Sequence, residues 1–145
     1  MLTIDELIEK SYWVVDLLPK QVPNNSEGQY FKVEKYYLNH RTDICQKFIN
    51  IILKLNCYYD IKVSHDGESW ENNPTPEMIA KAIKACVSPH SMESTLFVLF
   101  ETETSLIVID NDSTYMTLYN PTSGLLELTR QLASAEGLFT WQPPN

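Results

Sequence analysis

The sequence has little glycine and no excess of positive charge. Its four glycines form neither GxGxxG nor GxxxxGK[ST], so no loop is indicated whose backbone could approach a nucleotide phosphate closely. Acidic residues outnumber basic ones by 19 to 11, which gives a net charge of −8. Phosphate contacts supply most nucleic-acid affinity and need clustered lysine and arginine, so this balance argues against a nucleic-acid partner.

Paired cysteines and long apolar runs are also missing. The three cysteines form no CxxC motif, and this odd number is typical of reduced thiols in a cytosol. No apolar run approaches the roughly 20 residues that cross a bilayer. The amphipathic start, MLTIDELIEK, lacks the cationic region of a signal peptide. We therefore expect a cytoplasmic protein that does not associate with membranes.

What is present is typical of one globular domain spanning residues 1–145. A chain of 145 residues can bury roughly two-thirds of its unfolded surface. Three tryptophans, eight tyrosines and five phenylalanines supply a substantial core. The acidity fits either plain solubility or attraction to a basic partner.

Capping signals and apolar periodicity predict four helices separated by strands. The first expected helix covers 3–18, from a capping box at Thr3 and Glu6, and the second is capped by Asn39 or Thr42 and extends to Leu55. The third is opened by Thr75-Pro76, and the fourth runs from about Ser123 to a cap at Gly137. The expected strands are 29–38, 57–65, 95–101, 105–109, 114–119 and 138–142. This order, α-β-α-β-α-β-β-β-α-β, predicts an α+β domain whose mostly antiparallel sheet contains a three-stranded meander over about 95–119.

The segment DND at 110–112 is the best candidate for a cation site. Asp110, Asp112 and Thr114 stand at alternate positions, as ligands of a calcium loop do. However, Tyr115 replaces the glycine needed at the sixth position, and Pro121 replaces the glutamate needed at the twelfth. A hairpin turn is the simpler interpretation because Asp and Asn bond nearby backbone. A protein contact through the acidic turn is the remaining alternative.

The sequence offers no specific signal for another metal site, for a cofactor or for catalysis. His65, Asp66 and Glu68 lie close together in HDGES, but in a turn and without the spacing of HExxH or of a cysteine knuckle. GxSxG is absent. Cys57 or Cys86 could still meet His65 or His90 in space. Because a thiol in apolar surroundings is inert, we expect no catalytic activity.

Aromatic residues near expected strand ends and in a loop favour a protein-binding role. Trp70, set among acidic and amide residues, is the best candidate for an exposed anchor, and Tyr36 and Tyr58 lie near it in the expected arrangement. Two pairs of acidic residues would steer a basic partner toward them. These pairs are Glu101 with Glu103 and Asp110 with Asp112.

The chain is therefore expected to be a small acidic protein-binding module without a metal or cofactor. In size and acidity it resembles bacterial immunity proteins, which occlude basic toxin domains, and cytosolic secretion chaperones. Residues 76–135 also resemble profilin- or roadblock-type scaffolds in element order. Two alternatives stay open: a hydrolase or transferase that uses a cysteine and a histidine, and a homo-oligomeric structural protein that pairs the strand expected at 29–38 or 138–142.

Overall fold

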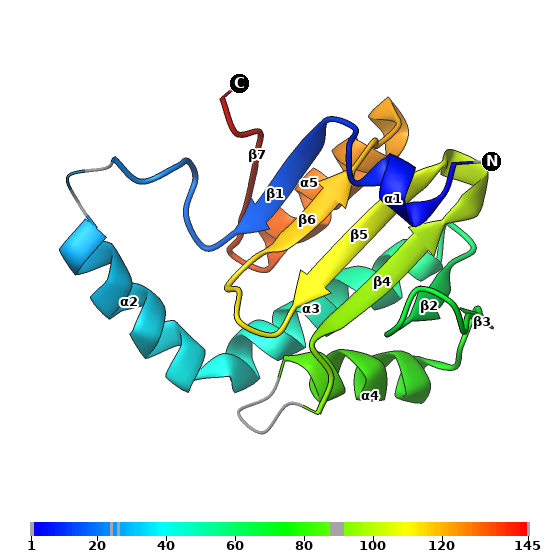
Figure 1. Cartoon of the computed structure of the whole chain (residues 1–145), viewed down its shortest axis with the longest axis horizontal. Coiled ribbons are helices and arrows are strands. Elements are labelled where there is room, and N and C mark those ends of the chain that lie inside the picture. Colours follow the sequence, from blue (N-terminus) through cyan, green and yellow to red (C-terminus); the bar gives the residue numbers. More distant parts are fainter. Residues whose placement is uncertain (1, 24, 26, 88–91, 145) are drawn as a thin grey trace.

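The computed structural model describes residues 2–23, 25, 27–87 and 92–144, which form helices on one sheet (Figure 1). The helices are α1 (Ile4–Leu7), α2 (Glu27–Asn39), α3 (Arg41–Asn56), α4 (Pro76–Cys86) and α5 (Ser123–Ala135). The strands are β1 (Tyr12–Asp16), β2 (Lys62–Ser64), β3 (Glu71–Asn72), β4 (Thr95–Phe100), β5 (Ser105–Asp110), β6 (Met116–Tyr119) and β7 (Phe139–Trp141). A 3₁₀ turn, Glu101–Glu103, connects β4 to β5.

The sheet has seven strands in the order β3-β2-β4-β5-β6-β1-β7. All strand pairings among the described residues are antiparallel. β4, β5 and β6 form the expected meander, in which Val98 lies opposite Ile107 and Ile107 lies opposite Leu118. The α+β class and the antiparallel sheet are therefore confirmed, and the expected element order is roughly correct.

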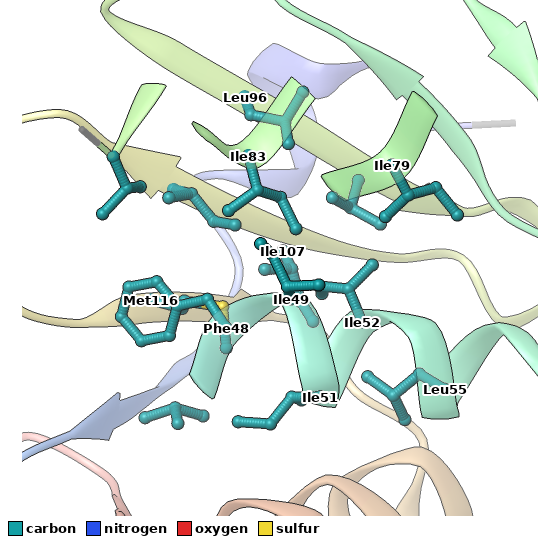
Figure 2. Close-up of a cluster of buried hydrophobic side chains, with 14 of the residues drawn as sticks. Phe48, Ile49, Ile51, Ile52, Leu55, Ile79, Ile83, Leu96, Ile107 and Met116 are labelled. Atoms are coloured by element: carbon teal, nitrogen blue, oxygen red, sulfur yellow. The ribbon is translucent and has the colours of Figure 1, made fainter. Parts of the chain in front are cut away.

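The main core lies between one face of the sheet and helices α3, α4 and α5. α3 contributes seven residues to it, more than any other element, because its apolar positions recur at helical spacing over the length of the helix. Figure 2 shows Ile79 and Ile83 of α4 pointing toward Ile49 and Ile52 of α3. Each such side chain contributes about 1.5–3 kcal/mol when it is fully buried.

The opposite face of the sheet carries a smaller apolar cluster under α1. Leu7 is 1% exposed and packs with Leu99 of β4 and Leu106 of β5. The predicted capping box is present, since Thr3 accepts a hydrogen bond from the Glu6 N–H and the Glu6 side chain accepts one from the Thr3 N–H. α1 covers only part of this face, which we call the open face.

The helix expected over 3–18 is wrong beyond its first turn. α1 ends at Leu7, and Tyr12–Asp16 is a strand between β6 and β7. Val15 lies in the main core, with Trp13 and Leu17 packed against it. Successive side chains of this segment point to opposite faces of the sheet, as in any strand. Its valines and aromatic residues also favour the strand conformation.

The strand expected over 29–38 is also wrong, because these residues belong to helix α2. Val33, Tyr36 and Tyr37 have helical i, i+3, i+4 spacing, and the Tyr30 hydroxyl donates to Glu34 one turn later. The high aromatic content of this segment suggested a strand, but the i, i+3, i+4 spacing of its apolar residues is that of a helix. α2 projects away from the sheet (Figure 1). Several of its aromatic side chains are exposed.

Candidate functional site

A groove lies between α2 and the part of the open face that α1 leaves uncovered. Its volume is ≈ 600 Å³. We call it the aromatic groove, after the rings that line it: Tyr12, Tyr30, Phe31, Tyr115, Tyr119 and Trp141. Asp16, Asp110 and Lys20 also line it. The strands place their residues there by alternation, since Tyr12, Val14 and Asp16 point away from the face that carries Val15.

Asp16 is a half-buried carboxylate in this groove. Its Oδ1 accepts a hydrogen bond of 2.7 Å from the Leu17 N–H. Burial nevertheless raises the pKa of Asp16, and the negative charge of Glu34 adds to this effect against the backbone hydrogen bonds of Leu17 and Leu18. None of the ion pairs that the structure describes involves Asp16. The carboxylate is therefore partly buried and has no ion-pair partner among the described residues.

The ionisable groups on α2 and on the sheet influence one another across the groove. The Tyr30 hydroxyl donates to Glu34 Oε2 over 3.0 Å. Burial, this hydrogen bond and the charges of Glu34 and Asp16 raise the pKa of Tyr30 to about 12. On the sheet, burial raises the pKa of Tyr119 in β6, with a smaller contribution from Asp110. The phenols of Tyr30 and Tyr119 therefore stay neutral at physiological pH, and the carboxylates give the groove a negative potential.

One donor in the groove has no hydrogen-bond acceptor among the residues that the structure describes. Trp141 lies opposite Val14 on the neighbouring strand, so its side chain shares the open face with Asp16. Its indole Nε1 is buried and has no hydrogen-bond partner within the described residues. The indole N–H favours the charged form of Asp16, although the two groups do not form a hydrogen bond of ordinary geometry. A buried donor without an acceptor is costly, so an acceptor that reached this group would remove the cost.

The residues expected to bind a partner are distributed over several places. Trp70 is only half-exposed and packs on the cluster around Leu7, where it lines a second groove of ≈ 560 Å³ together with Glu101. Tyr36 is 58% exposed on α2, and Tyr58 is 70% exposed just beyond α3. The exposed anchor is thus better represented by these tyrosines than by Trp70.

The acidic pairs lie at opposite ends of β5, because Glu101 and Glu103 precede the strand and Asp110 and Asp112 end and follow it. Six residues of strand separate them by roughly 17–20 Å, so they do not form one patch. Glu101 forms an ion pair with Lys62, and Glu103 accepts from the Thr122 hydroxyl.

At the other end, Asp110 accepts from the Thr95 hydroxyl and lines the aromatic groove, whereas Asp112 is exposed. Asp110 is the only predicted acidic residue that the structure brings into this groove, within the part of the chain it describes.

The cysteines and histidines form no catalytic pair among residues whose positions are described. Cys45 and Cys86 are buried, and burial raises the pKa of Cys86 to about 12. Cys57 is exposed, and its Sγ contacts the Leu53 carbonyl oxygen. His65 pairs with the Thr95 carbonyl, and His90 lies outside the described residues. In the described ranges, no group of three or more His, Cys, Asp or Glu side chains could hold a metal ion.

Sequence reasoning missed Asp16 and Trp141 as site residues. The signal was present, because Tyr12, Val14 and Asp16 alternate with Trp13, Val15 and Leu17. Interpreting this segment as a helix hid the alternation. The contribution of α2 could not be found while 29–38 was expected to be a strand.

Comparison of the chain with family models, with curated proteins and with solved structures finds no match. The resemblances to immunity proteins, secretion chaperones and profilin- or roadblock-type scaffolds therefore stay predictions. Within the described part of the chain, no helix has both the length and the apolar character to span a membrane.

Proposed function

We propose that this protein is a non-catalytic binding module whose aromatic groove receives a segment of a partner protein that carries apolar and basic side chains. The observation that carries the proposal is the Asp16 carboxylate, held among aromatic rings without an ion pair from the described residues. A basic side chain would neutralise it, and apolar neighbours would cover the rings. Aromatic side chains are common at the energetic centre of protein interfaces.

The rest of the molecule suits a basic partner. The net charge of −8 would attract a positively charged surface and speed its approach. By covering such a surface the module would act as an inhibitor or a chaperone of its partner, in the manner of the immunity and secretion-chaperone families that its sequence resembles. A cytoplasmic location is part of this proposal.

Selection from a displayed library of random peptides tests the proposal. Peptides retained by the protein should be enriched in apolar residues with at least one lysine or arginine. Asp16→Asn should weaken their binding, whereas Glu71→Gln removes one charge from exposed β3, at the opposite edge of the sheet, and should leave it unchanged. Retained peptides without basic residues, or equal effects of the two substitutions, would contradict the proposal.

A homo-oligomer is the second candidate, because α2 carries apolar side chains that are exposed. Val33, Tyr36 and Tyr37 are 46%, 58% and 38% exposed, and an apolar helix stripe of this spacing often packs on another helix. Light scattering over a range of concentrations tests it. A mass that rises with concentration and returns to that of the monomer in Tyr36→Ser/Tyr37→Ser would favour this candidate.

A further inference from the structure

Building on the proposed function, we infer that the aromatic groove recognises an arginine side chain within an extended peptide segment. The guanidinium pairs with the Asp16 carboxylate between the tyrosine rings. A main-chain carbonyl of the same segment accepts a hydrogen bond from the Trp141 indole N–H. Two groups that are incompletely satisfied in the free protein thus define two different requirements of one ligand.

The first requirement is a cation at Asp16. Glu34 stands close enough to oppose the ionisation of Asp16, and Asp110 lines the same groove. Lys20 also lines the groove, but it is exposed and forms no ion pair with Asp16 in the described structure. An incoming cation therefore meets a carboxylate with no cation already bound to it and a local excess of negative charge.

The aromatic rings around Asp16 favour arginine over lysine as this cation. A guanidinium is planar, weakly hydrated and able to form two parallel hydrogen bonds with a carboxylate, whereas an ammonium is compact and strongly hydrated. Tyrosine, phenylalanine and tryptophan faces favour a flat cation stacked on them. The chain already contains one such contact on its other face, where the Arg130 guanidinium lies 5.1 Å from the centre of the Trp13 ring.

The second requirement is an acceptor for the Trp141 indole N–H, which favours a peptide over a free guanidinium. An indole N–H only donates, and a guanidinium offers no acceptor, so a cation alone leaves Trp141 unsatisfied. Trp141 and Asp16 lie on adjacent strands and on the same face, with Asp16 opposite Phe139 and Val14 opposite Trp141. Both side chains line the same groove, so one extended segment that runs along it can present an arginine head to Asp16 and a main-chain carbonyl to the indole N–H.

Nuclear magnetic resonance of the ¹⁵N-labelled protein tests the inference through its three tryptophan indole signals. The probes are the capped tripeptides Leu-Arg-Leu, Leu-Lys-Leu and Leu-citrulline-Leu, where citrulline keeps the planar shape without the charge. We expect the arginine peptide to bind about tenfold more tightly than the lysine peptide, because it can form one more charge-assisted hydrogen bond. Binding should shift the Trp141 indole signal, and the citrulline peptide should produce no shift.

Two variants separate the parts of this inference. Asp16→Asn should abolish the preference for arginine over lysine, and Glu71→Gln, the distant control, should preserve it. Trp141→Phe, which also assigns the indole signal, should weaken binding of the arginine peptide and keep the preference for arginine over lysine. Equal binding of the arginine and lysine peptides, or no shift of the Trp141 signal up to the solubility limit, would overturn the inference. In either case the library selection still decides the proposed function, which fails if the retained peptides lack basic residues or if Asp16→Asn and Glu71→Gln affect their binding equally.

Discussion

At the scale of the residue, the partly buried charge of Asp16 lowers the stability of the folded protein. Burial raises its pKa above the ordinary value of 3.8, so the folded protein holds the proton on this carboxyl more tightly than the unfolded chain does. The free energy of unfolding therefore falls as the pH rises through this pKa range, because the folded state must then hold the charged form. A binding group that destabilises its own fold is a common feature of functional sites.

We therefore predict that Asp16→Asn stabilises the protein at pH 7 while it weakens peptide binding. The amide oxygen can still accept from the Leu17 N–H, and the unpaired charge is gone. Thermal unfolding at pH 7 and near pH 3 measures the effect, which should shrink at the lower pH, where Asp16 is protonated. Loss of stability at pH 7 in the variant would show that the carboxylate has a partner in the free protein.

The cysteines give a second prediction at this scale. Cys86 is fully buried, its Sγ lies 3.3 Å from the Ile109 carbonyl oxygen, and burial raises its pKa. Burial raises the pKa of Cys45 as well. Because the thiolate is the reactive form, we expect a thiol reagent to label only Cys57 quickly in the folded protein. Mass spectrometry after short labelling at neutral pH identifies the site, and unfolding in denaturant should release the other two. Fast labelling of Cys86 would revive the hydrolase or transferase alternative.

At the scale of the element, α2 differs from α3 in what holds it. Seven side chains of α3 are buried in the main core, whereas the exposed apolar residues of α2 contact little else of the described molecule. Tyr36 packs mainly on its neighbours Tyr37 and His40, with ring centres 5.5 Å and 4.2 Å apart. A helix whose apolar stripe faces solvent contributes little to the stability of the whole domain and is available for binding.

Substitution of this stripe should therefore change stability little. We predict that Tyr36→Ser/Tyr37→Ser lowers the free energy of unfolding by less than about 1 kcal/mol. The comparison variant is Phe48→Ala in α3, whose side chain is 0% exposed and whose loss should cost about 3–5 kcal/mol. Urea unfolding of both variants measures the difference. A large loss in the α2 variant would mean that the stripe is packed against another part of the chain.

The elements that sequence reasoning predicted correctly are those whose signals are local and mutually consistent. Thr75 caps α4 by accepting from the Met78 N–H, and Gly137 adopts a φ of 76° after α5, as its position predicts. The meander was predictable because polar turns separate nearly continuous apolar runs. By contrast, the apolar residues of 4–18 satisfy helical and strand periodicity at once, and pairing with β6 and β7 decided for the strand.

At the scale of the whole molecule, the two faces of the sheet have different roles. Helices α3, α4 and α5 cover one face with the main core, whereas α1 covers the other only in part and leaves a groove on either side. The aromatic groove combines segments near residues 12–23, 30–31, 110–119 and 141–143. No local pattern joins segments so far apart in sequence, so the site could not be predicted without the sheet order.

This arrangement separates long-range attraction from short-range contact, and the kinetics of binding should show the separation. Asp112 is exposed beyond the end of β5, outside the residues that line the groove, and Asp16 lies within the groove. Exposed charges act mainly on the association rate and are screened by salt, whereas buried contacts act mainly on the dissociation rate. For a basic peptide selected from the library, Asp112→Asn should slow association at low salt and leave dissociation unchanged.

Asp16→Asn should mainly speed dissociation, and its effect should persist at physiological salt, where the Debye length is about 8 Å. Stopped-flow fluorescence of a labelled peptide measures both rates. Glu101→Gln is the matched control for Asp112→Asn, because Lys62 already neutralises Glu101 and its removal should change association less. If Asp112→Asn acted on dissociation as strongly as Asp16→Asn, the acidic turn would be part of the contact surface, and the partner would extend past the groove onto the end of β5.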